Sequence, residues 1–180
     1  LFLHSHFSRG ILAFSAQIQP FAGKYRCIFP DFRGHGRSKS EDLSWDSRRN
    51  AKDMFDFLDA LKIERVHLIG YSMGSYVGLY MASMYPKRIK SFIGIGSSTK
   101  PMPSGSEDFL PENVILHNNQ KLIQDTLVRH FDAHRGNWQE FLRQTVSDWQ
   151  NHPSLSDKEW QAITCPLFFI NGELDEFGSC

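Results

Sequence analysis

The stretch Gly70-Tyr71-Ser72-Met73-Gly74 stands between a short apolar run and a helical pattern. The run before it, Val66–Ile69, is β-prone and has the length of a buried strand. The apolar positions after it recur at helical spacing as far as Tyr85, where Pro86 permits the helix to stop. The sequence therefore predicts a strand, a sharp turn at the serine, and a helix.

The two glycines of this stretch explain what such a turn does for a serine. A serine hydroxyl is a poor nucleophile, so it has to stand exposed beside a base, on a turn too tight for side chains two positions away. Gly70 and Gly74 supply that space, and the turn aims the backbone N–H of Met73 at a tetrahedral oxyanion. We therefore predict that Ser72 is a nucleophile, the alternative being a glycine-flanked turn with an idle serine.

Length and composition limit the classes of protein that fit this chain. Its 180 residues suffice for one domain, and its formal net charge of zero favours neither a nucleic-acid partner nor an anionic membrane surface. No apolar run approaches about 18 residues, so no membrane span is expected. The three cysteines, Cys27, Cys165 and Cys180, lack metal-ligand spacing and are interpreted as reduced thiols. We expect neither a metal nor a cofactor.

The beginning of the chain bears on where the protein resides. It starts at Leu1, without an initiator methionine and inside a predicted strand, so we expect a fragment truncated at both ends. A signal peptide is then neither indicated nor excluded. A cytoplasmic location is our expectation, and the oligomeric state stays open.

Apolar runs of four to six residues alternate with helical patterns, which is typical of β-α-β units. We therefore predict an α/β fold with a mostly parallel sheet and helices on both faces. Between the second and third runs, residues 51–61 predict an amphipathic helix, with Ser44 as its N-cap and Asp46 favourably placed against the helix dipole. The predicted strands are Leu1–Leu3, Tyr25–Phe29, Val66–Ile69, Phe92–Ile95 and Leu167–Ile170.

Residues 100–162 break this alternation and predict a helical cap or lid, inserted into a core of residues 1–99 and 163–180. The insertion opens with a Pro-, Ser- and Gly-rich stretch and continues with two helical patterns. Most of their apolar residues are expected to attach the insertion to the core, and a minority to line a pocket. The two stripes are Leu122, Ile123, Leu127, Val128 and Phe131, followed by Trp138, Phe141, Leu142, Val146 and Trp149.

Four segments, in this order, resemble motifs of the α/β-hydrolase superfamily, and the resemblance covers nearly the whole chain. Leu3–His6 is similar to the His-Gly turn after a strand, and Asp31–Ser38 to the Asp-x-Arg-Gly-x-Gly-x-Ser loop after the next strand. Gly70–Gly74 resembles the nucleophile elbow, and Asn171–Asp175 the turn that carries the acid. The resemblance implies an incomplete α/β-hydrolase fold with a helical cap, of the serine-nucleophile, esterase- or lactonase-like branch.

The resemblance also implies residue roles. Ser72 would be the nucleophile, and Asp175 the acid that orients the catalytic histidine and stabilises its imidazolium form. The backbone N–H groups of Met73 and His6 would form the oxyanion hole. In the family a glycine stands where this chain has Ser5, so a positive φ at that position would strain Ser5 or shift the loop.

Two other acids, Glu173 and Glu176, flank Asp175 and compete for its role. Asp175 is favoured because it has the family's Gly-x-x-Asp spacing from Gly172, whereas Glu173 is interpreted as a turn residue and Glu176 as exposed. An Asx-turn acid without a catalytic part is the alternative for Asp175.

The general base is the larger departure from the family. Chain order there is serine, acid, histidine, and no histidine follows Asp175, so we expect the catalytic histidine beyond Cys180. A cap histidine that reaches Ser72 is an alternative to simple surface placement. The upstream histidines are His4 and His6 in the oxyanion-side turn, His35 in the loop after the second strand, His67 in a strand, and His117, His130, His134 and His152 in the insertion.

These expectations combine into a serine-dependent hydrolase that cleaves small esters, lactones or related carbonyl substrates through an acyl-enzyme. The Trp- and Phe-rich cap indicates a small-molecule substrate with an apolar moiety. A serine nucleophile argues against the dehalogenase and epoxide-hydrolase branches. A C–C bond hydrolase or lyase stays open, as does a degenerate ligand-binding member of the same fold.

Overall fold

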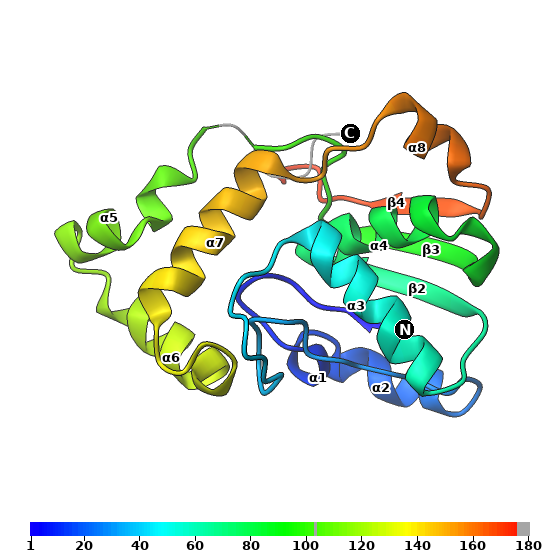
Figure 1. Cartoon of the computed structure of the whole chain (residues 1–180), viewed down its shortest axis with the longest axis horizontal. Coiled ribbons are helices and arrows are strands. Elements are labelled where there is room, and N and C mark those ends of the chain that lie inside the picture. The colour runs from blue at the N-terminus through cyan, green and yellow to red at the C-terminus, as the bar shows by residue number, and fades with distance from the viewer. Residues whose placement is uncertain (103, 176–180) are drawn as a thin grey trace.

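The computed structural model describes residues 1–102 and 104–175, and its centre is a four-stranded sheet in the order β1-β2-β3-β4 (Figure 1). All neighbouring strands are parallel: Leu3 pairs with Gly70, Gly70 with Gly94, and Gly94 with Phe169. The turns after these strands therefore meet at one end of the sheet. The strands are β1 (Phe2–Leu3), β2 (Val66–Tyr71), β3 (Ile89–Ile95) and β4 (Leu167–Ile170).

The helices surround this sheet unevenly. Two of them, α3 and α4, pack together on one face, and α8 packs against α4, whereas α5, α6 and α7 lie together to one side of the sheet (Figure 1). Short 3₁₀ turns cover Pro86–Arg88 and Glu107–Phe109. The helices are α1 (Gly10–Ala13), α2 (Ser15–Ala22), α3 (Ser47–Ala60), α4 (Met73–Met84), α5 (Pro111–Leu116), α6 (Gln120–His134), α7 (Trp138–Asn151) and α8 (Asp157–Ala162).

The helix that follows the serine, α4, is the centre of the core. Every residue from Met73 to Ser83 is buried, as expected for a helix that is apolar on all sides. It contacts β1, β2 and β3 on one side and α3 on the other. Gly78 lets the helix approach the sheet, because a Cβ there would overlap the ring of Phe92. The predicted strand, turn and helix are thus confirmed.

The predicted amphipathic helix is α3, but its N-cap differs from the prediction. Asp46, not Ser44, is the N-cap, and its side chain accepts a hydrogen bond from the backbone N–H of Arg49 at 2.7 Å. Ser44 lies too far before the first turn to reach these N–H groups, and its hydroxyl donates to Asp42 at 2.7 Å. The buried positions of α3 include Met54, Phe55 and Leu58, and the helix packs against α4.

The predicted strand Tyr25–Phe29 is wrong, because this segment is not a strand. One ladder-like hydrogen bond joins it to the sheet, from the Phe2 N–H to the Ile28 carbonyl at 2.9 Å. Strand β1 has only two residues and is too short to continue the hydrogen-bond ladder. In addition, Pro30, which follows Phe29, has no N–H to donate. The apolar character of the run is used for packing instead, since Phe29 stacks on Phe2 with ring centroids 4.5 Å apart.

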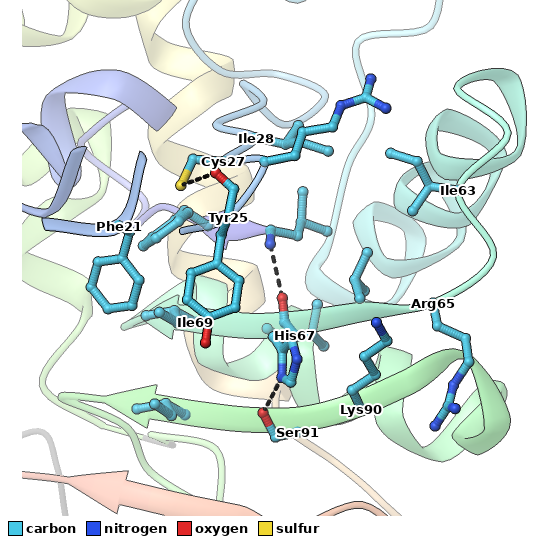
Figure 2. Close-up of a pocket in the computed structure, with 16 residues that line it drawn as sticks. Phe21, Tyr25, Cys27, Ile28, Ile63, Arg65, His67, Ile69, Lys90 and Ser91 are labelled. Carbon is cyan, nitrogen blue, oxygen red and sulfur yellow. Dashed lines mark hydrogen bonds between the residues drawn. The ribbon is translucent and has the colours of Figure 1, made fainter. Parts of the chain in front are cut away.

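The face of the sheet opposite α4 is covered near β1, where Phe2 contacts the rings of Phe14 and Phe21. Toward β4 the same face exposes large apolar side chains, including Phe168 at 62% and Ile170 at 46%. A cavity of about 360 Å³ lies on this face between the segment 21–28 and the strands β2 and β3. Figure 2 shows the side chains that line it, with His67 and Ser91 hydrogen-bonded across the two strands at 2.8 Å.

The predicted cap, residues 100–162, contains α5 to α8, and its boundaries stay a prediction. Helices α6 and α7 pack against each other, and the stripe of α7 is buried at Phe141, Leu142 and Val146. On α6 the stripe is partly solvent-exposed, with Val128 at 76% and Phe131 at 58%. The apolar face of α7 therefore attaches the segment to the rest of the chain more than that of α6 does.

Candidate active site

Ser72 occupies the turn between β2 and α4 with φ 53° and ψ −118°. A positive φ is uncommon for a residue other than glycine, and such strained residues cluster at functional sites. The turn is held to the neighbouring strand, because the Ser72 N–H donates to the Ile95 carbonyl at 2.9 Å. The unusual backbone geometry predicted for this serine is confirmed.

The two glycines beside Ser72 are positions of close backbone approach. A Cβ on Gly70 would overlap the carbonyl of Gly74, and a Cβ on Gly74 would overlap the carbonyl of Leu3. The first turn of α4 therefore lies directly against the end of β1. This contact places Ser72 beside the loop that begins at His4.

A second serine braces the elbow and was missed by the sequence analysis. The Ser75 hydroxyl donates to the Gly70 carbonyl at 2.8 Å and accepts from the Ile95 N–H at 3.2 Å. It thereby ties the first turn of α4 to the ends of β2 and β3. The available signal in the sequence was a serine three residues after the nucleophile, in a segment that is otherwise mostly apolar.

Asp175 follows β4 in a turn that is fastened to the end of β3. Its N–H donates to the Gly172 carbonyl at 3.1 Å. The side chain of Asn171 accepts from the Ser97 N–H at 2.9 Å and donates to the Ser97 carbonyl at 3.0 Å. The acid turn is thus at the same end of the sheet as Ser72, while Glu173 is exposed and Glu176 lies outside the described residues.

Tyr76 reports which carboxylates lie close to the start of α4. Burial, followed by the negative charges of Asp148 and Asp175, raises the pKa of Tyr76 to about 12. Tyr76 is one helical turn after Ser72, so both carboxylates act electrostatically on the region beside the serine. Geometry agrees, because a Cβ on Gly96 would lie 3.6 Å from Asp175 Oδ2, and Gly96 directly follows Ile95, whose carbonyl accepts from the Ser72 N–H.

The two N–H groups predicted to bind an oxyanion belong to Met73 and His6. Met73 is the first residue of α4, where backbone N–H groups have no intrahelical acceptor. Within residues 1–102 and 104–175, neither the Met73 N–H nor the His6 N–H donates to a protein acceptor. Ser5 is not among the described residues with positive φ, so the loop accommodates a serine there without that strain.

His4 joins the oxyanion-side loop to the segment after it. Its Nδ1–H donates to the Ser5 carbonyl at 2.8 Å, and its Nε2 accepts from the Phe32 N–H at 3.0 Å. This pair of bonds fixes the neutral tautomer of the ring. Burial lowers the pKa of His4 to about 4, consistent with a structural role.

The Asp31–Ser38 motif has a structural role in this chain. The Asp31 carboxylate accepts from the Gly10 N–H at 2.8 Å and the Arg37 N–H at 3.1 Å. Arg33 pairs with Asp53 of α3, with its Nε 2.6 Å from the carboxylate. These contacts hold the loop onto α3 and onto the start of α1.

Two histidines of α6, His130 and His134, are buried, so the surface placement expected for the cap histidines is wrong for them. The Nδ1 of His130 accepts from the Gly36 N–H at 3.0 Å, and Gly36 itself has φ 56°, a conformation that favours glycine. The ring of His130 also stacks on Phe141, with centroids 4.6 Å apart. The rings of His35 and His130 therefore lie in the contact between α6 and the Arg33–Gly36 loop. His130 is thus packed inside the protein and not on its surface.

The side chain of His6 is held by a residue that the sequence analysis missed. Its Nε2 lies 2.9 Å from Asp148 of α7, and Asp148 also accepts from the N–H and the hydroxyl of Ser47 at 2.6 Å and 2.7 Å. The signal was an acid among the apolar positions of α7, where a carboxylate is rarely buried without a partner. Sequence alone could not name partners 101 and 142 positions away.

A family model for the alpha/beta hydrolase fold matches residues 2–162, and the chain belongs to this family. No helix within the described part of the chain has both the length and the apolar character needed to cross a membrane. The parallel sheet and the sharp turn at Ser72 between β2 and α4 agree with that assignment.

Named relatives and a solved structure were also found. The chain is 36% identical over 102 residues, 54% of its length, to a 2-hydroxy-6-oxononadienedioate/2-hydroxy-6-oxononatrienedioate hydrolase of Paraburkholderia xenovorans. A protein of the same name from Paraburkholderia phymatum is 26% identical over 91% of the chain. The matches span 33% and 65% of these two relatives. A thermophilic esterase from Thermogutta terrifontis shares the fold, with a TM-score of 0.73 at 21% identity over 98% of this chain and 71% of the esterase.

Proposed function

We propose that the protein containing this chain is a serine-dependent hydrolase that cleaves small esters, lactones or related carbonyl substrates through an acyl-enzyme. The observation that carries the proposal is the strained backbone of Ser72, with φ 53°, between a parallel strand and a buried helix. This geometry holds a hydroxyl at the end of the sheet, next to the Met73 N–H, which donates to no acceptor within the described residues.

In the proposed reaction the Ser72 Oγ attacks the substrate carbonyl carbon and its proton passes to a histidine oriented by Asp175. We propose that this histidine follows Cys180 in the whole protein. The oxyanion accepts hydrogen bonds from the N–H groups of Met73 and His6. The leaving alcohol takes the proton from the histidine, and water then cleaves the acyl-serine to release the acid.

Aromatic side chains beside His6 support an apolar substrate. Phe7, which follows His6, lies 5.8 Å from both Phe109 and Trp149, ring centroid to ring centroid, and the latter two rings are 5.1 Å apart. All three side chains are partly exposed. A surface of this kind next to an oxyanion hole would bind the apolar moiety of a small molecule.

Hydrolysis of a C–C bond is the second candidate. It is favoured by the similarity to two relatives named as hydrolases of 2-hydroxy-6-oxo-dienedioates. In that reaction water cleaves the C–C bond next to a ketone carbonyl. An ester hydrolase instead cleaves the C–O bond between the carbonyl carbon and the alkoxy oxygen. A binding protein without turnover shares the fold and is the third reading.

The three candidates are separated by assaying the full-length protein and its Ser72→Ala variant. We expect hydrolysis of p-nitrophenyl acetate to fall by about 10³-fold or more in Ser72→Ala. Ser72-dependent cleavage of a 2-hydroxy-6-oxo-dienoate that exceeds ester cleavage in kcat/KM would favour the C–C candidate. A folded protein with no Ser72-dependent turnover of either substrate would contradict the proposed hydrolase.

A further inference from the structure

Asp148, on the buried face of α7, joins three elements that are far apart in the chain. It is 1% exposed and accepts from the His6 ring of the oxyanion-side loop at 2.9 Å. It also accepts two hydrogen bonds from Ser47, the first residue of α3, at 2.6 Å and 2.7 Å. The carboxylate therefore links α7, the start of α3 and the loop that carries the proposed second oxyanion donor.

The surroundings of Asp148 stabilise the ionised form of its carboxylate. Burial acts to raise its pKa, but the hydrogen bonds that the carboxylate accepts from His6 and Ser47 outweigh burial and lower the pKa overall. The N-terminus of α3 adds favourable dipole charge. An ionised carboxylate can accept but not donate, so the proton in the 2.9 Å contact is on Nε2 of His6.

Fold stability does not by itself account for a buried carboxylate at this place. Apolar residues of similar volume commonly serve a protein core as well as a buried ion pair does. One of the three hydrogen bonds of Asp148 holds the ring of His6, whose Nδ1 has no partner among the described residues. A second cap residue, Arg129 of α6, donates to the carbonyl of Phe7 at 2.8 Å. The loop is thus held from the cap at two consecutive residues.

We propose that Asp148 is a positioning residue that holds His6 so that its backbone N–H stays aligned with the oxyanion formed at Ser72. This inference rests on the proposed hydrolase function. The cap would then have a second role besides covering the substrate, because its residue Asp148 would hold one donor of the oxyanion hole in place. A donor aligned in advance stabilises the transition state more than the bound substrate, so Asp148 acts on kcat more than on KM.

The first test is Asp148→Asn in the full-length protein, with Asp53→Asn as the matched control. Asp53 also loses a short ion pair by this change, to Arg33 at 2.6 Å, and in the described part of the chain the hydrogen bonds of its side chain go to Arg33 alone. We expect kcat of Asp148→Asn to fall by about 10- to 100-fold with KM within about two-fold of the unaltered protein. Unchanged kcat, or a fall matched by Asp53→Asn at equal melting temperature, would overturn the proposal.

A double-mutant cycle tests whether Asp148 acts through His6. In a His6→Phe background, Asp148→Asn should have no further effect on kcat, because the ring that it holds is gone. Independent, additive losses would overturn the proposal. Should Asp148→Asn fail to fold, Ser47→Ala removes one of the three hydrogen bonds to the carboxylate and should lower kcat in the same direction by a smaller factor.

Hydrogen exchange separates failure of this inference from failure of the proposed function. Backbone amides of residues 5–8 should exchange faster in Asp148→Asn than in the unaltered protein, and should not change in Asp53→Asn. Unchanged exchange in Asp148→Asn would overturn the positioning role even in an active enzyme. A protein without Ser72-dependent activity would refute the proposed function and, with it, the catalytic part of this inference, whatever the exchange shows.

Discussion

Ser72 holds a positive φ because the residues on either side of the turn give it room and because the neighbouring strand binds its N–H. Gly70 and Gly74 permit β2, α4 and the end of β1 to approach more closely than any Cβ would allow. The Ser72 N–H bond to Ile95 fixes the turn against β3. Strain at one residue is therefore balanced by the packing of three elements.

Gly74→Ala tests this account of the elbow. Its Cβ would overlap the Leu3 carbonyl, so we expect the free energy of unfolding to fall by about 1–3 kcal/mol or more. Gly23→Ala is the matched control, because a Cβ there meets open space and its φ of −72° suits alanine. Urea unfolding of both variants measures the difference, and equal stability would contradict the close approach.

Buried histidines make stability depend on pH. Burial lowers the pKa of His4 to about 4, that of His130 to about 2, and that of His35 well below its ordinary value. Each has a pKa near about 6.5 when unfolded, so below that pH the unfolded chain binds more protons than the folded one, and stability falls as pH falls.

We expect the free energy of unfolding to be highest above about pH 6.5 and to drop by about 3 kcal/mol between pH 7.5 and 5.5 for His4 and His130 together, with His35 adding to the drop in the same direction. Urea unfolding at the two pH values measures this drop. A stability that is flat over that interval would show that the histidines are not held neutral.

At the scale of elements, local patterns predicted the β2 strand, the α4 helix and the amphipathic α3 well, because each is defined by the periodicity of adjacent residues. Tyr25–Phe29 has the same apolar character as a strand, but its partner β1 is too short to pair with it. The contact of His130 with Gly36 and the contact between Asp148 and His6 join residues 94 and 142 positions apart, which periodicity does not encode.

The N-cap of α3 gives a prediction for an element. Asp46→Ala should lower the free energy of unfolding by about 1 kcal/mol, because the Arg49 N–H loses its acceptor. Ser44→Ala, at the exposed position first expected to be the cap, should change it by less than about 0.5 kcal/mol. Chemical denaturation compares them, and a larger effect of Ser44→Ala would restore the original assignment of the cap.

At the scale of the molecule, the parallel sheet brings the turns after β2 and β4 to one end, and α7 adds Asp148 to the same region. The sequence motifs predicted Ser72, Met73, His6 and Asp175, and their catalytic roles stay predictions. Asp148 contacts His6 of the loop after β1, and Asp175 lies close to Gly96, the residue after β3. A hydrolytic site assembled in this way requires Ser72 to react as a nucleophile.

The most direct test of that requirement is intact-mass analysis of the full-length protein after treatment with a fluorophosphonate, which forms a stable adduct with activated serines. We predict one phosphonyl group per chain, located on Ser72 by peptide mapping and absent from Ser72→Ala. In Asp175→Asn the labelling rate should fall by about 10³- to 10⁴-fold, because the histidine loses its orienting carboxylate. A folded protein that stays unlabelled, or that is labelled at another residue, would contradict the assignment of Ser72 as the nucleophile.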